Sequence, residues 1–324
     1  MITQQTGLYW ILLAAGGLLS AGLFVLSARR EGFPAGKALA GFLAGLPCAF
    51  LLSKAVWILL DLAAAYPEGP VAWFRPVPGE FSFVAGCAGF CLGPALVFRS
   101  RRDEILDCLA LPGCLLIAFA RFGEIFCGAL GLADVYTLGL PDIREGSLLA
   151  RFPFSAADAW GVRYLAVSTL AAGAALAIAL FAVIKQKSRD RLPAGCLFER
   201  CALLLCAVRL FLEPMRMESL VFYFVHVDQA LAALLLAGLM IRGCLRRRKE
   251  TGRFPAAPLV LTLLCLALNG LAQDMMDKLW QFEPFLPEGV FQWISGHLGL
   301  FGFSLILIAS ACPAVIHGHL VRKR

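Results

Sequence analysis

Two pairs of oppositely charged residues lie inside segments that are otherwise apolar. Arg121 and Glu124 are three residues apart, and Arg209 and Glu213 are four apart, so each pair shares one face of a helix. Lys54 is a further charge, in the middle of another apolar segment. An ionisable group at membrane depth is costly and by default marks a functional site. These five residues are therefore the first candidates for chemistry.

Two interpretations of the arginine–glutamate pairs stay open. In the first, each arginine neutralises the carboxylate on its own helix, and the pairs only stabilise packing. In the second, the pairs converge on one polar cavity that takes an anionic guest, because guanidinium groups bind phosphate oxygens at two points. Desolvation makes a buried ion pair a poor source of stability, which favours the second interpretation. In a membrane, that guest is the head group of a phospholipid.

The composition places these charges in a membrane protein. Of the 324 residues, 60% are hydrophobic and 16% are charged, and the mean hydropathy is +0.78. These values exclude an ordinary soluble domain. A run of about 20 apolar residues is long enough to cross a bilayer as a helix. We predict nine such segments, at 7–27, 38–60, 81–98, 105–126, 161–184, 196–214, 226–243, 257–273 and 291–315.

The joints between these segments alternate in charge. One set of joints, taken with the C-terminal residues, holds nineteen of the 29 lysines and arginines, whereas the other set holds six. By the positive-inside rule, the N-terminus then lies outside and the C-terminus lies in the cytoplasm. This arrangement predicts an all-α polytopic membrane protein in which both arginine–glutamate pairs lie in the outer half of their helices.

No metal or cofactor is expected. The twelve cysteines are scattered through apolar segments, where we interpret them as small buried hydrophobic side chains. No cysteine or histidine cluster has the spacing of a zinc site. His317 and His319 would need a third ligand to hold a metal, and the sequence offers none nearby.

Three stretches resemble motifs of the prolipoprotein diacylglyceryl transferase family. Residues 79–89 (GEFSFVAGCAG) resemble the family's GG-x-SFHGGLLG stretch, residues 120–128 (ARFGEIFCG) resemble GRIGNFINGE, and residues 209–216 (RLFLEPMR) resemble RF-x-x-EF-x-R. Tyr9 stands where the family has a tyrosine in its first helix, and Gln229 stands where it has a glutamine that starts a helix. The resemblance extends over about residues 8 to 243 and includes a seven-helix bundle with an outward N-terminus.

The resemblance implies an enzyme that transfers a diacylglyceryl group from phosphatidylglycerol to the lipobox cysteine thiol of a lipoprotein precursor. Glycerol phosphate leaves, and prepositioned cations stabilise its growing charge. The thiol attacks as a thiolate. The implied site faces the outer side of the plasma membrane of a bacterium, and its partners are phosphatidylglycerol and the signal segment of the precursor, with no nucleic acid. The implied catalytic residues are Arg121, Glu124, Arg209 and Glu213, and the implied substrate-binding residues are Tyr9, Gly123, Gly128, Arg216 and Gln229.

The proton-handling part of the motifs departs from the family pattern. Val84 stands at the family's histidine, Glu124 at its signature asparagine, Cys127 at its second asparagine and Ala129 at its glutamate. Glu124 is therefore a candidate for a substitute general base. The alternative is a catalytically altered relative that binds anionic phospholipid, or partners another membrane protein, through the same cavity. A small-solute transporter is a third hypothesis, but the sequence contains no inverted repeat to support it.

The last part of the chain lies outside the resemblance. We predict a transferase-like domain over residues 1–250 and an additional pair of transmembrane helices over residues 251–324. The joint between these two helices is rich in aromatic residues, which suit the membrane interface. No role for this pair follows from the sequence.

Overall fold

The structure is a computed structural model. It describes residues 6–60, 74–75, 80–133, 146–157, 162–187, 192–216, 220–222, 225–279 and 283–320. Seven helices in these ranges are long and apolar enough to cross a membrane, and they are α1, α2, α5, α7, α9, α10 and α12. The prediction of a polytopic all-α membrane protein is therefore confirmed.

Each predicted apolar segment contains a helix. The main helices are α1 (Thr6–Arg30), α2 (Ala35–Leu60), α4 (Phe83–Val97), α5 (Arg102–Gly123), α7 (Val167–Lys187), α8 (Cys196–Leu212), α9 (Val227–Thr251), α10 (Ala256–Asp277), α11 (Glu288–Gly296) and α12 (Leu298–Leu320). Two of the nine predicted spans do not reach the length and apolarity of the other seven. The helix α4 has only 15 residues, and α8 has 17 residues that include Glu199, Arg200 and Arg209.

Two predicted boundaries were wrong. The segment 291–315 is not one helix, because α11 ends at Gly296 and α12 begins at Leu298. Glycine is a weak helix former, so a break beside Gly296 has a local cause. The segment 161–184 begins with a strand instead of a helix, since β2 (Arg163–Leu165) pairs antiparallel with β1 (Ser155–Ala157). A second short hairpin pairs β3 (Val221–Phe222) with β4 (Val225–His226) just before α9.

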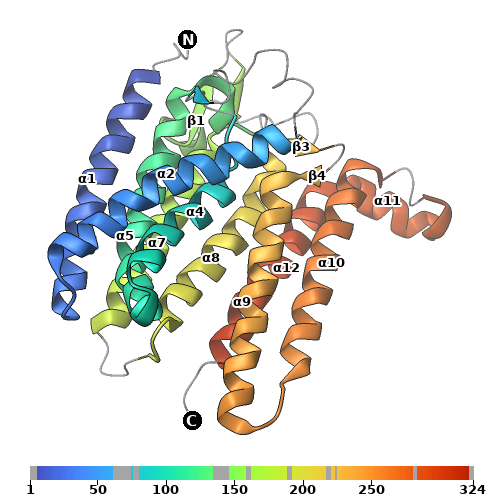
Figure 1. The fold of residues 1–324 in the computed structure, drawn as a ribbon. Helices are drawn as coiled ribbons and strands as arrows, with labels where there is room; N and C mark the ends of the chain where they lie inside the picture. The colour runs from blue at the N-terminus through green and yellow to red at the C-terminus, as the bar shows by residue number, and fades with distance from the viewer. Residues whose placement is uncertain are drawn as a thin grey trace.

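The helix α8 lies at the centre of the bundle (Figure 1). It contacts α5 and α7 on one side and α9 and α12 on the other. The C-terminal helices α10 and α12 pack on each other, and both contact α9. The division into residues 1–250 and 251–324 stays a prediction, but the C-terminal pair is in contact with the rest of the bundle.

The basic joints gather at one end of the bundle, which we call the basic end. The Arg101 Nη2 atom donates to the carbonyl oxygen of Glu31 at 3.2 Å, which joins the start of α5 to the end of α1. Arg242 of α9 pairs with Asp103 of α5 at 2.7 Å. Arg200 of α8 donates to the carbonyl oxygen of Gly318, near the end of α12, at 3.3 Å. The ends that the charge pattern assigns to one side therefore lie together.

Glycine permits the close approach of α2 and α4. A Cβ atom on Gly89 would lie 2.5 Å from the carbonyl oxygen of Cys48 and 3.0 Å from the Cα atom of Ala49. Both of these atoms belong to the backbone of α2, so they cannot rotate away. Small residues at helix contacts let backbones approach in membranes, where packing replaces the hydrophobic effect between helices.

We expect the substitution Gly89→Ala to lower the free energy of unfolding by about 1–3 kcal/mol, because the added methyl group overpacks α2 against α4. Gly22→Ala in α1 is the matched control, since no atom lies within 4 Å of its Cβ position. Thermal unfolding in detergent measures both variants. Equal midpoints for Gly89→Ala and Gly22→Ala would show that the α2–α4 contact is looser than described.

Candidate functional site

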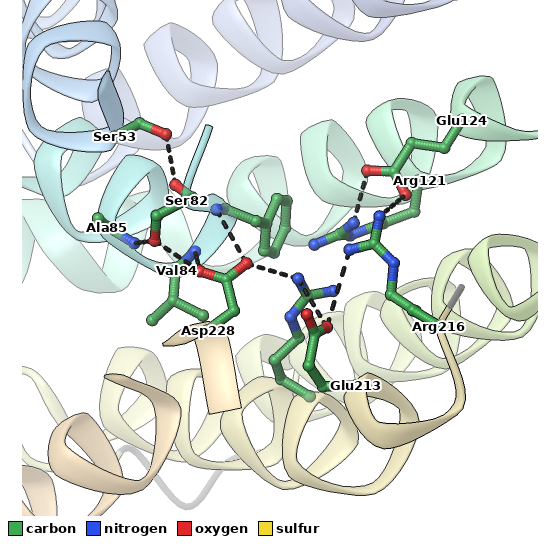
Figure 2. A network of polar contacts seen from close by, with 11 residues as sticks. Ser53, Ser82, Val84, Ala85, Arg121, Glu124, Glu213, Arg216 and Asp228 are labelled. Atoms are coloured by element: carbon green, nitrogen blue, oxygen red, sulfur yellow. Dashed lines mark hydrogen bonds and ion pairs between the residues drawn. The ribbon is translucent and has the colours of Figure 1, made fainter. Parts of the chain in front are cut away.

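Six charged residues form a buried cluster at the end of the bundle opposite the basic end. They come from four places in the chain: the end of α5, the end of α8, the segment after α8 and the start of α9. We call this set the arginine cluster, and its members are Arg121, Glu124, Arg209, Glu213, Arg216 and Asp228. Figure 2 shows how Arg121, Glu124, Glu213, Arg216 and Asp228 lie toward one another.

The α5 side of the arginine cluster centres on Glu124, which begins the short 3-10 helix η3 (Glu124–Phe126) directly after α5. Its Oε1 atom accepts from Arg121 Nη1 at 2.5 Å. Its Oε2 atom accepts from Arg216 Nη2 at 3.4 Å. The Glu124 carboxylate therefore contacts Arg121, the partner that the spacing predicted, and also Arg216 from a distant segment.

The α8 side centres on Arg209. Its Nη2 atom lies 2.7 Å from Glu213 Oε2, in the 3-10 helix η6 (Glu213–Met215), and 2.5 Å from Asp228 Oδ2 in the first turn of α9. Glu213 Oε2 also lies 3.7 Å from Arg216 Nη1. Both predicted intrahelical pairs are thus formed, and Arg216 connects them into one chain of alternating charge.

Asp228 also holds the start of α4. Its Oδ1 atom accepts from the Ser82 hydroxyl at 2.5 Å and from the backbone N–H of Val84 at 3.3 Å, and its Oδ2 atom accepts from the N–H of Phe83 at 3.0 Å. Ser82 is the N-cap of α4, and its hydroxyl accepts from the N–H of Ala85. A carboxylate suits this place, because it satisfies N–H groups that a helix start leaves without partners.

The ring of Phe83 lies beside the arginines of both predicted pairs. The guanidinium carbon of Arg121 lies 3.5 Å from the centre of this ring, and that of Arg209 lies 5.3 Å from it. A cation over an aromatic face is attracted by the negative charge of that face. Phe83 therefore stabilises two like charges in the same site.

Two arginine nitrogens of the arginine cluster have no hydrogen-bond partner among the residues that the structure describes. They are Arg121 Nη2 and Arg209 Nε, and both are buried. Only 2% of Arg121 is exposed. Mutual neutralisation therefore explains the ion pairs but leaves donors of two buried guanidinium groups unsatisfied.

A cavity of about 30 Å³ opens between α5, α7 and α8 beside the arginine cluster. Three arginines and one glutamate line it, so its formal charge is +2: Arg121, Arg209, Arg216 and Glu124. Glu213 and Asp228 do not line it. The volume is enough for about two water molecules. The cluster as a whole is neutral, but its cavity face is cationic.

The charged side chains of the cavity lie at one end, together with apolar ones, and the other end is apolar. Ile117 on α5 and Leu205 on α8 also line it, and each lies one turn closer to the basic end than the arginine on its own helix. On α7, Ser168 lines the cavity and Ala171 follows one turn deeper. The chemistry of this lining, though not its volume of about 30 Å³, suits a ligand with an anionic head and an apolar tail.

Tyr9 and the two predicted site glycines lie next to the arginine cluster. A Cβ atom on Gly123 would be 3.0 Å from Cδ2 of Tyr9, so the absent side chain lets the α1 tyrosine pack against the end of α5. Gly128 has a φ of +71°, which a residue with a side chain rarely adopts. Glycine at these two positions has a local structural cause.

Gln229 follows Asp228 in the chain, but its side chain makes its hydrogen bond away from the arginine cluster. Its Nε2 atom donates to Asn269 Oδ1 on α10 at 3.0 Å, and Asn269 Nδ2 donates to Ser310 Oγ on α12 at 2.9 Å. Lys54 has its own partner, Glu80, and lies 4.0 Å from the ring centre of Trp57. The role of Gln229 in substrate binding stays a prediction.

Sequence reasoning missed Asp228 and Ser82. An acidic residue at a helix start and a serine before a helix are ordinary features, and nothing local marks them as neighbours of an arginine. One signal could have found Asp228. The three arginines of the cluster outnumber Glu124 and Glu213, the two carboxylates that the spacing predicted as partners, so a third carboxylate was to be expected. In the described ranges, no three His, Cys, Asp or Glu residues lie together as metal ligands do.

No model of a known protein family matches this chain, and no curated protein matches it either. The resemblance to prolipoprotein diacylglyceryl transferases therefore depends on the three short motifs at 79–89, 120–128 and 209–216. Residues of all three stretches meet in the site, because Phe83 from the first lies against Arg121 from the second and Arg209 from the third.

We expect Asp228→Asn to lower the free energy of unfolding by about 3 kcal/mol, near the lower limit for a broken buried ion pair, because Glu213 still pairs with Arg209. Glu250→Gln at the basic end is the control. Its ion pair with Arg247 is exposed, and such pairs contribute about 1 kcal/mol or less. Unfolding in detergent compares the two variants, and an Asp228→Asn protein as stable as the wild type would contradict the role given to Asp228.

Proposed function

We propose that this protein transfers the diacylglyceryl group of phosphatidylglycerol to a cysteine thiol of a lipoprotein precursor. The observation that carries this proposal is the cavity beside the arginine cluster, cationic at one end and apolar one helical turn deeper. A phosphodiester head group suits the first part and an acyl chain suits the second. The meeting of the three motif stretches around Phe83 supports the same conclusion.

In this reaction the thiolate sulfur attacks the glyceryl carbon next to the phosphate. A carbon–sulfur bond forms, the carbon–oxygen bond to the phosphate breaks, and glycerol phosphate leaves with the electron pair. Arg121 is the main candidate to stabilise the developing charge, because its Nη2 atom has no hydrogen-bond partner in the described ranges. Arg209 and Arg216 line the same cavity.

Glu124 is the candidate that accepts the thiol proton. It is the one carboxylate that lines the cavity among the described residues. Val84, at the place of the family's histidine, contributes only its backbone N–H to Asp228 in this site. A head group is larger than the cavity of about 30 Å³, so binding requires side chains to separate. The 3.4 Å contact between Arg216 and Glu124 is the longer of the two that Glu124 makes, and we expect it to open.

The alternative function, an anionic-phospholipid-binding relative without transferase activity, has a specific observation in its favour. Both oxygens of the Glu124 carboxylate are already paired with arginines, so neither is aimed at an incoming thiol. The same cavity would then bind the lipid without a competent base. The two functions share the head-group site and differ only in the chemical step.

A transfer assay with purified protein, phosphatidylglycerol and a lipobox peptide tests the proposal. We expect thioether product from the wild type and a loss of about 10²–10³-fold in rate for Arg121→Ala, the usual effect of removing a preorganised donor to a developing charge. Arg248→Ala, an exposed arginine at the basic end, is the control and should keep full activity.

Two results of this assay would change the assignment. Full activity in Glu124→Gln would remove Glu124 as the base. No product from the wild type at any pH, with binding of phosphatidylglycerol retained, would favour the non-catalytic relative.

We further propose that the protein spans the plasma membrane of a bacterium with its arginine cluster toward the outer side. The gathering of basic residues at the opposite end supports this orientation through the positive-inside rule. Glycerol phosphate would then be released outside the cell.

Reporter fusions test this orientation. A cytoplasm-active reporter placed after Arg253, between α9 and α10, should be active, and the same reporter placed after Glu283, between α10 and α11, should be inactive. A reporter that is active only outside the cytoplasm serves as the control and should give the reverse pattern. The opposite result at both sites would invert the proposed topology.

A further inference from the structure

Ser168 is a buried polar residue that neither the motifs nor the ion pairs account for. It is the second residue of α7, and only 2% of it is exposed. Its hydroxyl has no hydrogen-bond partner in the part of the chain that the structure describes. It lines the same cavity as Arg121, whose Nη2 atom is unsatisfied in the same way.

We propose that Ser168 and Arg121 together bind the phosphate of the ligand, with the Ser168 hydroxyl and Arg121 Nη2 donating to phosphate oxygens. This inference rests on the proposed function for the identity of the lipid, but its chemistry needs only a phosphate group. It makes Ser168 a phosphate-binding residue contributed by α7, a helix that carries none of the three motifs.

The physical reason is that one ligand satisfies both groups. A buried hydroxyl or guanidinium N–H without a partner is unfavourable, because it has lost its hydrogen bonds to water. A phosphate offers several acceptor oxygens, and the +2 charge of the cavity lining favours an anion over a neutral ligand. Ser168 also lies in the first turn of α7, where the helix dipole adds to the attraction for an anion.

Gly131 leaves the space that the Ser168 hydroxyl occupies. A Cβ atom on Gly131 would lie 2.7 Å from Ser168 Oγ and 3.0 Å from the carbonyl carbon of Glu124. Gly131 belongs to η4 (Gly128–Gly131), the short 3-10 helix that follows the second motif. The substitution Gly131→Ala would therefore displace the hydroxyl without changing Ser168 itself, although it also crowds the backbone of Glu124.

Thr169 provides a matched control. Its hydroxyl is also buried and also has no hydrogen-bond partner among the described residues. Unlike Ser168, Thr169 does not line the cavity. A purely structural effect of removing a buried hydroxyl from the start of α7 should appear in both variants, whereas a loss of phosphate binding should appear only in Ser168→Ala.

The test measures binding to the full-length protein in phosphatidylcholine nanodiscs that contain increasing amounts of phosphatidylglycerol. We expect Ser168→Ala to weaken binding about 10- to 100-fold, the effect of losing one hydrogen bond to a charged group. Gly131→Ala should weaken binding in the same direction. Thr169→Val should bind as the wild type does, and thermal unfolding of Ser168→Ala and Thr169→Val should be alike.

A second arm titrates inorganic phosphate into nanodiscs of phosphatidylcholine alone. Binding that depends on Ser168 in this arm, and not in the phosphatidylglycerol arm, would assign the site to free phosphate and still support the inference. Equal affinities of Ser168→Ala and wild type in both arms would overturn it.

The transfer assay separates this inference from the proposed function. A raised KM for phosphatidylglycerol with nearly unchanged kcat in Ser168→Ala would support both. Weakened lipid binding in Ser168→Ala, with no thioether product from the wild type, would leave the phosphate site standing and overturn the transferase. Product formation with the same KM in the wild type and in Ser168→Ala would support the transferase and overturn the phosphate-binding role of Ser168.

Discussion

Charges that are removed from water must be paired, and this requirement joins the helices at one end of the bundle. Arg209 reaches Asp228 on α9, and the same carboxylate holds the N–H groups at the start of α4. Glu124 and Arg216 extend the chain of ion pairs to the end of α5. Four helix termini are therefore positioned by one set of mutually dependent contacts, in which the loss of one partner leaves another charge buried.

The same pairing leaves an excess of positive charge on the face of the cluster that lines the cavity. Glu213 and Asp228 neutralise Arg209 from the side away from the cavity, so the cavity itself is lined by more positive than negative charge. The two interpretations of the sequence are thus compatible, because intrahelical neutralisation leaves a cationic cavity face at which the proposed anion could bind. The paired face fixes the positions of the helix ends, and the unsatisfied donors of Arg121 and Ser168 remain on the other face.

The sequence was sufficient for features that depend on local spacing or on averages over a segment. Apolar runs predicted the helices, and separations of three and four residues predicted the pairs of Arg121 with Glu124 and of Arg209 with Glu213. Contacts between distant segments could not be predicted in this way. Asp228 is 19 residues from Arg209, and the partner of Gln229 is 40 residues away on α10. The break before α12 was missed because apolar residues continue on both sides of it.

The central claim is that the cationic end of the cavity holds the phosphate of an anionic phospholipid and that its apolar end holds an acyl chain. A cryo-EM structure of the protein in phosphatidylglycerol nanodiscs tests this most directly. The account predicts phosphate density within hydrogen-bond distance of Arg121 and Ser168, with chain density that continues between Ile117 and Leu205. A closed cavity, with ordered lipid only on the outer surface of the bundle, would contradict it.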